Sequence, residues 1–485
     1  MLLNNMNKNI IMKIGNHNCK IKKTLSFLIV AVTLVSIKAY AQEQSEMPNL
    51  IVIMTDDMGW ADVGFNGCKD IPTPNIDRIA NEGVRFEEGY VSFPVCGPSR
   101  AGFLTGRYQD RFGFTTNPSI DPKNPKAGLP LEEETMAQVL QKANYNNAIV
   151  GKWHMGTHEV FHPLNRGFDY FYGFLSGGHN YFPDQLYLND LSEVTKKWEW
   201  YRTKIIENRT KVETDHYLPD ELSDAAVRYI EKQADNDQHF MLYLAYNAPH
   251  TPMQATEKYL SRFPDIKYKR RKTYAAMVSA VDDGVGRVLK SLEENDIDEN
   301  TIIVFLSDNG GASNNASDNG PLRGRKGDLF EGGNRVPFAM RWKAKLPQGV
   351  TYDKAVSSLD IMATIIAQTN VKISPERPLD GVNLIPFLTG TDQGDPHDFL
   401  FWRKQEQNAM AILYENYKLV ANKNRKNNPP ELFDLSKDLG ETTNIKLQNK
   451  EVYKRLLRIW KEMNSQMKDR VFPTLGNDNW WSTKD

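Results

Sequence analysis

The sequence lacks a hydrophobic run long enough to cross a membrane comfortably. Near the N-terminus an apolar stretch covers only residues 25–37; five lysines precede it, and no acidic residue occurs before Glu43. A basic region, a short apolar segment and the small-residue pattern Ala39-Tyr40-Ala41 are typical of a secretory signal peptide. We therefore predict a signal peptide over residues 1–41 and an exported protein, periplasmic or secreted, with no stable membrane insertion after cleavage.

The sequence also has almost no net charge, −1 over 485 residues, and no low-complexity tract. A hydrophobic content of 40% and a charged content of 25% are ordinary for a soluble globular protein, and the length predicts two domains. Residues 1–41 contain six lysines and no Asp, Glu or Arg, so their removal changes the net charge to −7. Such a chain is a poor candidate for binding nucleic acid, and an anionic substrate would need positive charge concentrated in a pocket.

Cysteine is scarce, with three residues in the whole chain. Cys19 precedes the apolar stretch and would leave with the signal peptide, so only Cys68 and Cys96 would remain. In an exported protein the default interpretation of two cysteines is one disulfide. The residues that follow Cys96 favour a different role.

Four short apolar runs are each followed at once by polar or charged residues. Such runs, bounded by Gly, Pro or Asn, are typical of buried strands. They cover residues 50–54, 148–150, 240–246 and 302–306, and they lead into Thr55-Asp56-Asp57, Gly151-Lys152-Trp153-His154, Asn247-Ala248-Pro249-His250 and Ser307-Asp308-Asn309-Gly310. Because ligands gather beyond the carboxyl ends of strands in such sheets, we expect these four polar segments to meet.

Helical segments between the runs predict an α/β fold with a large, parallel or mixed sheet flanked by helices. We expect helices over 74–81, 132–142, 219–233 and 270–293, the first with Thr73 as N-cap and the last carrying a buried apolar stripe. After Asn383 the pattern changes to short antiparallel strands at 399–403, 409–414 and 417–421 and a helix at 452–467. This predicts a large domain over 42–385 and a smaller α+β domain over 386–485.

Asp56, Asp57, Asp308 and Asn309 are candidates for a metal site. Three carboxylates and one amide offer only oxygen ligands, which suit a hard divalent cation. Ca²⁺ fits the mixed set, and Mg²⁺ stays open. Acidic residues that follow strands are also often simply solvated. These residues alone therefore do not decide between a metal site and solvated side chains.

The segment from Val95 to Arg107 carries a specific motif. It reads Cys96-Gly97-Pro98-Ser99-Arg100, followed after three residues by Leu104-Thr105-Gly106-Arg107. This resembles the signature of formylglycine-dependent (type I) sulfatases, C-x-P-S-R-x-x-x-L-T-G-R. One departure is Gly97, where many members carry a hydroxyl residue. The polar segments named above and Gly324-Arg325-Lys326-Gly327 occur in the family's order, so the resemblance covers nearly all of the chain after the signal peptide.

The resemblance implies an alkaline-phosphatase-like α/β domain with a smaller C-terminal domain, in agreement with the predicted elements. It also implies that a formylglycine-generating or anaerobic sulfatase-maturating enzyme oxidises Cys96 to Cα-formylglycine (3-oxoalanine). A hydrated aldehyde carries two hydroxyls on one carbon; one can ionise beside a divalent cation and attack sulfur. Deprotonation of the second hydroxyl then expels sulfate and restores the aldehyde, a step that a serine ester lacks.

Residue roles follow from the same resemblance, position by position. The four oxygen ligands above would hold the metal together with the modified Cys96. Arg100, where a helix is expected to begin, would support the formylglycine diol, and Lys152 and Lys326 would bind the sulfate oxygens. His154 would be the base that drives elimination. His250, assisted by Lys326, would donate a proton to the leaving alkoxide, because an alkyl alcohol is a poor leaving group.

A second set of residues could contact a sugar. His179 lies in a polar and aromatic segment, Gly177 to Phe182, and Arg166 and His216 are further candidates for substrate binding. Aromatic residues of the same region could stack on carbohydrate, although such side chains more often belong to a core: Tyr187, Trp198, Trp200 and Tyr201.

The implied activity is hydrolysis of sulfate esters of a carbohydrate, either an oligo- or polysaccharide of algal type such as ulvan or carrageenan, or a glycosaminoglycan. Two alternatives stay open. One is a phosphodiesterase or phosphonate monoester hydrolase on the same fold. The other is a non-catalytic carbohydrate-binding relative, against which the complete set of metal, cysteine, lysine and histidine positions argues.

Overall fold

A computed structural model describes residues 47–236, 238–423, 427–472 and 480–483. The predicted signal peptide over residues 1–41 lies outside these residues. Within the described ranges, no helix is both long and apolar enough to cross a lipid bilayer.

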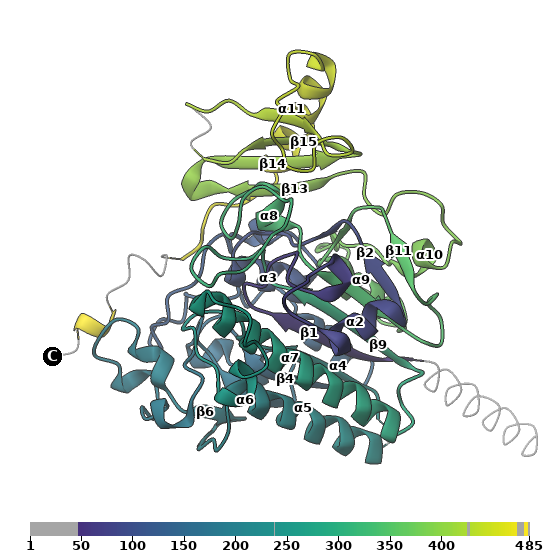
Figure 1. Cartoon of the computed structure of the whole chain (residues 1–485). Helices are drawn as coiled ribbons and strands as arrows, with labels where there is room; N and C mark the ends of the chain where they lie inside the picture. The colour runs from purple at the N-terminus through teal and green to yellow at the C-terminus, as the bar shows by residue number, and fades with distance from the viewer. Residues whose placement is uncertain (1–46, 237, 424–426, 473–479, 484–485) are drawn as a thin grey trace, which may run out of the picture. The chain divides into compact units, whose positions relative to one another are not determined.

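In the described part of the chain, a mixed sheet of ten strands has the order β11-β2-β10-β9-β1-β8-β4-β5-β6-β7 (Figure 1). Its strands are β1 (Asn49–Thr55), β2 (Val84–Phe86), β4 (Asn146–Lys152), β5 (Tyr170–Phe174), β6 (Ile205–Glu207), β7 (Thr210–Val212), β8 (Phe240–Ala245), β9 (Thr301–Ser307), β10 (Phe338–Arg341) and β11 (Val350–Tyr352). A separate parallel pair consists of β3 (Gly89–Tyr90) and β12 (Val356–Ser357).

The four strands predicted from the apolar runs are neighbours at the centre of this sheet. Strands β9, β1, β8 and β4 lie side by side and run parallel, with Met54 paired to Leu306 on one side and to Ala245 on the other. On one side the antiparallel strand β10 flanks β9; on the other side β5 continues parallel to β4, and β6 is antiparallel to β5. The mixed sheet is confirmed, and the carboxyl ends of the four strands share one edge.

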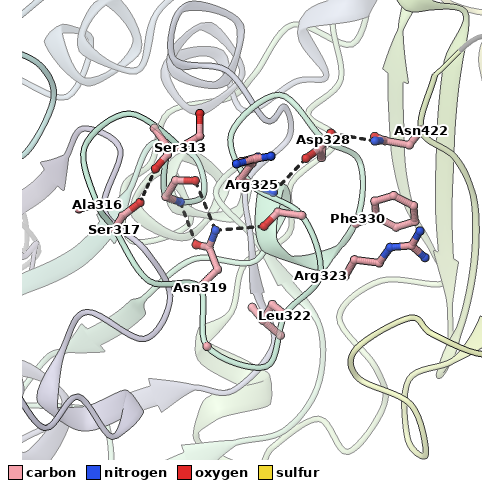
Figure 2. Close-up of a pocket in the computed structure, with 14 residues that line it drawn as sticks. Ser313, Ala316, Ser317, Asn319, Leu322, Arg323, Arg325, Asp328, Phe330 and Asn422 are labelled. Carbon is pink, nitrogen blue, oxygen red and sulfur yellow. Dashed lines mark hydrogen bonds between the residues drawn. The ribbon is translucent and has the colours of Figure 1, made fainter. Parts of the chain in front are cut away.

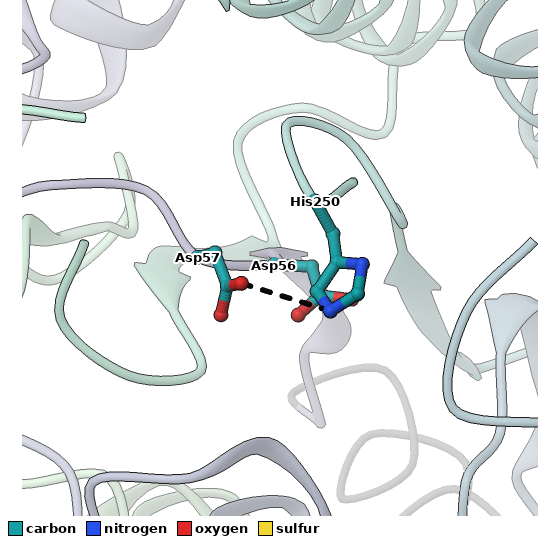
Figure 3. Close-up of side chains that lie close together, drawn as sticks. All are labelled: Asp56, Asp57 and His250. Atoms are coloured by element: carbon teal, nitrogen blue, oxygen red, sulfur yellow. Dashed lines mark ion pairs between the residues drawn. The ribbon is translucent and has the colours of Figure 1, made fainter. Parts of the chain in front are cut away.

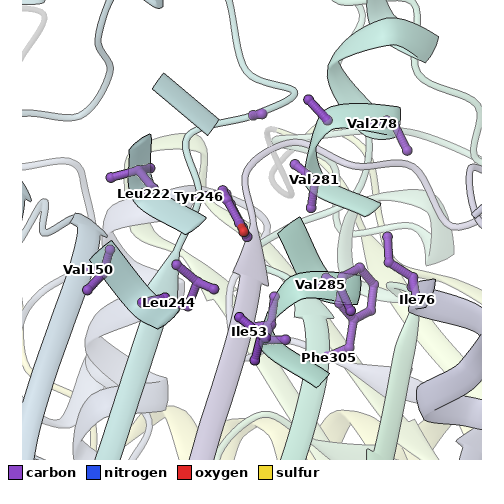
Figure 4. Close-up of a cluster of buried hydrophobic side chains, with 14 of the residues drawn as sticks. Ile53, Ile76, Val150, Leu222, Leu244, Tyr246, Val278, Val281, Val285 and Phe305 are labelled. Atoms are coloured by element: carbon purple, nitrogen blue, oxygen red, sulfur yellow. The ribbon is translucent and has the colours of Figure 1, made fainter. Parts of the chain in front are cut away.

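Helices cover the sheet, and α7 carries the predicted apolar stripe. Val278, Val281 and Val285 of α7 are fully buried and belong to one hydrophobic cluster with Ile53 and Phe305 of the sheet, and Val285 lies beside both of them (Figure 4). Helix α5 lies beside α7. The helices are α2 (Pro74–Asn81), α3 (Cys96–Thr105), α4 (Met136–Gln141), α5 (Leu218–Asp235), α6 (Glu257–Leu260), α7 (Lys269–Glu294), α8 (Glu331–Asn334), α9 (Asp360–Ile366), α10 (Ile385–Leu388) and α11 (Lys450–Asn464).

Two local predictions need correction. The helix expected over 132–142 is only α4, because Thr135 and Gln138 form a capping box that starts the helix there. Thr73 is the residue before α2, but its hydroxyl does not cap that helix. Instead the hydroxyl accepts a bond from the Gly64 backbone at 2.8 Å and donates to Asp77 at 3.0 Å.

The C-terminal strands form a second, antiparallel sheet in the order β13-β14-β15-β16, with α11 packed against it. Three of these strands were predicted: β13 (Leu400–Lys404), β14 (Ala409–Tyr414) and β15 (Tyr417–Ala421). The prediction missed β16 (Glu431–Asp434), a short strand that pairs with β15. Trp460 of α11 stacks on Phe401 of β13 with ring centroids 5.7 Å apart. The boundary at residue 385 stays a prediction.

Candidate active site

The polar residues that follow β1 and β9 form one buried cluster at the sheet edge. Asn309 donates from Nδ2 to Oδ1 of Asp57 at 2.8 Å, and the Asp57 backbone N–H donates to Oδ1 of Asp308 at 3.3 Å. Asp56 and Asp57 also lie against His250, which follows β8 (Figure 3). The three carboxylates and the amide predicted as metal ligands are therefore brought together.

The cluster has the unmet hydrogen-bonding capacity that a cation would satisfy. Oδ1 of Asp56 and Oδ1 of Asn309 are buried and have no hydrogen-bond partner among the described residues. One ligand atom each from Asp56, Cys96 and Asp308 lie within 4.8 Å of one another. Buried acceptors without donors are costly, and a hard divalent cation takes oxygen ligands. These residues fit such a cation.

Cys96 lies at the first position of α3, with Val95 as N-cap, and is 2% exposed. It is a free thiol, as is Cys68, so the two form no disulfide. The Gly97 backbone N–H donates to Oδ1 of Asn117 at 3.0 Å, and a Cβ on Gly97 would come within 2.7 Å of that oxygen. The departure from the family motif at Gly97 thus makes room for Asn117.

Three predicted cations each pair with a carboxylate of the cluster. The pairs are Arg100 with Asp308 at 2.8 Å, Lys152 with Asp56 at 2.6 Å, and Lys326 with Asp57 at 2.6 Å. The first two pairs have fully buried side chains. Buried charges persist only when they are paired and hydrogen-bonded. Three positively charged side chains therefore lie at this cluster, each balanced by one carboxylate.

This pairing separates the pKa values of neighbouring carboxyls. Burial raises the pKa of Asp57, but Lys326 and His250 outweigh it and hold that pKa at about 2. Burial and the adjacent Asp56 raise the pKa of Asp308 to about 6, against the effect of Arg100. Burial opposes the charge of Lys326, yet Asp57 raises its pKa well above the usual value. Lys326 is therefore protonated at neutral pH.

The two predicted histidines differ in their contacts. His154 has φ 60°, is buried, and neither ring nitrogen has a hydrogen-bond partner among the described residues. Burial and then Lys152 lower its pKa well below the usual value. His250 has Nδ1 2.7 Å from the Thr251 carbonyl and Nε2 3.7 Å from Oδ2 of Asp57; burial lowers its pKa to about 4. Both imidazoles are neutral at pH 7.

A cavity of about 530 Å³ opens onto this cluster. Four predicted residues line it: Cys96, His154, His250 and Lys326. The aromatic residues Trp198, Trp200 and Tyr201 also line it. Sequence reasoning did not assign a role there to Asn180, Arg202, Thr251 or Asn314, whose only sequence signal is their place in or beside polar, aromatic or histidine-bearing loops.

The other predicted substrate contacts, Arg166, His179 and His216, do not line this cavity, and the side chains of the first two have structural partners. Arg166 is buried and donates to the carbonyls of Leu129 at 2.8 Å and Glu133 at 2.7 Å. His179 is buried, stacks on Phe174 and lies 3.0 Å from the Asn180 carbonyl. His216 is exposed.

Residues from the second sheet hold the loop that carries Lys326, a link that the sequence does not show. Lys404 of β13 donates to the Gly327 carbonyl, and Asn422, just after β15, bonds the Leu329 backbone N–H at 2.6 Å. Residues of the same loop and Asn422 line a second cavity of about 540 Å³ (Figure 2). The C-terminal sheet therefore contributes to the position of Lys326.

Tyr243 of β8 is another residue that sequence reasoning missed. Its hydroxyl accepts a hydrogen bond of 2.9 Å from Arg100, whose guanidinium also donates to the Lys152 carbonyl at 3.3 Å. Tyr243 is fully buried in a central strand, where an aromatic residue reads from sequence only as core. It fixes the orientation of Arg100 beside the predicted metal ligands.

Comparisons with known proteins agree with this geometry. N-acetylgalactosamine-6-sulfatase of Mus musculus is 33% identical over 384 residues, covering 76% of this chain and 71% of the relative. The solved structure of Ps i-CgsB with k-i-k-neocarrahexaose has a TM-score of 0.83 and 38% identity, covering 88% of this chain and 94% of that one. PsFucS1 sulfatase from Pseudoalteromonas sp. has a TM-score of 0.75 and 26% identity, covering 91% and 94%.

Two family models match the chain itself. The model of the C-terminal region of N-sulphoglucosamine sulphohydrolase matches residues 325–470. The sulfatase model matches residues 48–371, which include the cysteine motif and all of the predicted metal ligands. The chain belongs to the sulfatase family and has its alkaline-phosphatase-like fold.

Proposed function

We propose that this sulfatase removes sulfate from a sulfated oligo- or polysaccharide, with a formylglycine derived from Cys96 as nucleophile and one divalent cation, Ca²⁺ in the first place. The observation that supports this most directly is that one cavity is lined by Cys96, Lys326, Trp198 and Tyr201. The ammonium of Lys326 suits a sulfate group, and aromatic faces suit a sugar ring.

The first roles that we assign are cation binding and the positioning of residue 96. Asp56, Asp57, Asp308 and Asn309 would hold the cation, which supplies Lewis-acid stabilisation of negative oxygen. Arg100 holds the start of α3 against Asp308 and thereby places residue 96.

Proton transfer falls to the two histidines. His154 is neutral and its ring nitrogens have no hydrogen-bond partner among the described residues, so it could take the proton whose loss expels sulfate from residue 96. His250 would donate to the leaving alkoxide, since the negative charge of a bound substrate raises its pKa from the low value of the free site. Lys326 would stabilise the charge on that oxygen from the other side of Asp57.

The cellular setting is part of the same proposal. The basic and apolar segment at residues 1–41 favours export to the periplasm or beyond, where sulfated polysaccharides are found. A maturation enzyme would have to oxidise Cys96 before the chain folds around it, since the thiol is 2% exposed in the folded protein.

The test is desulfation by the full chain, expressed with a maturation enzyme. Substrates are a panel of defined sulfated oligosaccharides, an aryl sulfate and an aryl phosphate, and Cys96→Ala is the control. We expect release of sulfate from at least one oligosaccharide and none from Cys96→Ala. A strong preference for phosphate would favour the phosphodiesterase or phosphonate hydrolase alternative. Carbohydrate binding without turnover by the matured protein would favour the non-catalytic one.

A further inference from the structure

Resting on the proposed function, we infer that Arg202 is a binding site for a second anionic group on the substrate, one that stays on the sugar after the scissile sulfate has left. Arg202 is the last residue of the 3₁₀ helix Glu199–Arg202 and lines the cavity that also contains Cys96 and Lys326. Preferred substrates would therefore carry a second sulfate ester or a carboxylate.

The first support is charge. In the catalytic cavity the ammonium of Lys326 is paired with Asp57 at 2.6 Å. Within the described ranges, by contrast, no carboxylate lies within ion-pair distance of Arg202, whose side chain is exposed. An arginine guanidinium has five N–H donors, and it binds sulfate or carboxylate through two parallel hydrogen bonds.

The second support is preorganisation. One terminal nitrogen of Arg202 donates to the Tyr187 hydroxyl, and the guanidinium lies over the Tyr187 ring at 5.5 Å from its centroid. The two backbone segments are also joined: Leu188 N–H donates to the Arg202 carbonyl at 3.0 Å, and Lys204 N–H donates to the Leu188 carbonyl at 2.7 Å. An exposed arginine would otherwise lose several rotamers on binding, so this fixation lowers the entropic cost.

The third support is the pair of aromatic side chains close to Arg202 in the sequence. Trp198 and Tyr201 belong to the same short segment and line the same cavity, and Trp198 is 53% exposed. Aromatic faces contact the apolar face of a sugar, and a guanidinium beside them contacts a charged substituent of that sugar. The segment thus combines the two contacts that a multiply charged carbohydrate needs.

The test compares pairs of oligosaccharides that share a backbone. One galactan pair carries one or two sulfate esters per disaccharide, and one N-acetylgalactosamine 6-sulfate pair has or lacks a neighbouring uronate. We expect the matured wild type to prefer the more charged member of at least one pair by about tenfold or more in kcat/KM, through KM. The pair that shows the preference identifies the second anion as sulfate or carboxylate.

Variants assign the preference to the residue. In Arg202→Gln we expect the preference to fall to about threefold or less, in Arg202→Lys to fall partly, and in Tyr187→Phe to lie between wild type and Arg202→Gln. Arg209→Gln is the matched control, because Arg209 is also exposed but pairs with Glu159 and does not line the cavity. It should keep the wild-type preference.

Two results would overturn the inference, and they are distinguishable. Desulfation of both members of every pair with equal kcat/KM, or a preference that Arg202→Gln retains, rejects the second anion site and leaves the carbohydrate sulfatase standing. Turnover of an aryl sulfate but of no oligosaccharide rejects the proposed function and this inference with it.

Discussion

The floor and the rim of the catalytic cavity are built in different ways. We call floor the cluster of Asp56, Asp57, Cys96, Asp308 and Asn309 with its paired cations, and rim the segment 198–202 with Tyr187. The floor residues come from the ends of central strands and the start of α3, and they are buried and charge-paired. The rim is a short surface segment that includes the 3₁₀ helix Glu199–Arg202; it has the exposed aromatic side chains Trp198 and Tyr187, and its arginine has no carboxylate partner among the described residues.

This difference separates chemistry from selection. Groups that stabilise a transition state must be held rigidly and away from water, which strand ends and buried ion pairs provide. Groups that select a sugar must reach its ring and substituents, and loops provide such surfaces on a rigid scaffold. Perturbing the floor should therefore change the rate with every substrate, whereas perturbing the rim should change the preference among substrates.

Removal of the cation should have the largest effect. With a strong chelator we expect desulfation to fall by about 10³-fold or more for aryl and carbohydrate substrates alike, because the floor loses its Lewis acid. Added Ca²⁺ should restore activity and raise the melting temperature of the apo protein. In Asp56→Asn the Ca²⁺-dependent shift should shrink. Equal activity and equal melting with and without chelator would contradict a metal at the floor.

Lys326→Ala should come next. Loss of the cation that pairs with Asp57 removes charge stabilisation at the sulfate, so kcat/KM should fall by about 10²-fold or more on every substrate. The neighbouring Arg325 is exposed and does not line the catalytic cavity, so Arg325→Ala is the matched control and should stay within about twofold. A similar loss in both variants would mean that the loop, and not the ammonium, is responsible.

A smaller effect is expected from the support beneath the rim. Trp200 packs against Trp481 near the C-terminus, with ring centroids 5.1 Å apart, and Trp480 belongs to the same apolar cluster. In Trp481→Ala the rim should be less ordered, raising KM for an oligosaccharide by about three- to tenfold with kcat nearly unchanged. Aryl sulfate, which does not need the rim, should be unaffected.

Leu447→Ala is the control for that variant, because Leu447 is an apolar side chain of the same C-terminal region that is 72% exposed. An equal rise of KM for the aryl sulfate would show that Trp481 supports the floor as well. That result would contradict the division of roles between floor and rim.

The smallest effect concerns stability beneath the rim. Burial lowers the pKa of His179 to about 4, so the folded protein keeps this residue neutral where the unfolded chain, with a pKa near 6.5, is protonated. The unfolded state then binds the extra proton, and stability falls as pH falls from about 6.5 to 4. By urea unfolding, wild type should lose about 2 kcal/mol more than His179→Asn between pH 7 and 4.5. Parallel pH profiles of the free energy of unfolding for wild type and His179→Asn would contradict this prediction.

Much of the floor is readable in the sequence, because its candidate metal ligands follow strands directly and Cys96 begins a helix; Lys326, in the loop between β9 and α8, is the exception. The apolar runs that predict β1, β4, β8 and β9 also place the segments that follow them at one edge of the sheet. The spacing of Cys96, Pro98, Ser99 and Arg100 indicates the sulfatase family. Errors at this level were local, such as the length of α4, where a capping box overrides the amphipathic pattern.

The rim is where prediction from sequence ends. Arg166 and His179 are candidates for substrate contact from the sequence. In the structure, however, Arg166 donates to backbone carbonyls, and His179 contacts a backbone carbonyl and stacks on Phe174. Arg202, not singled out from the sequence, lines the cavity because Tyr187 and a backbone ladder hold it there. The sequence by itself determined the family, the sheet and the catalytic floor, since these depend on residues adjacent to strands. Only the tertiary structure decided the rim, because its side chains are positioned by packing between segments distant in the chain, such as Trp200 against Trp481.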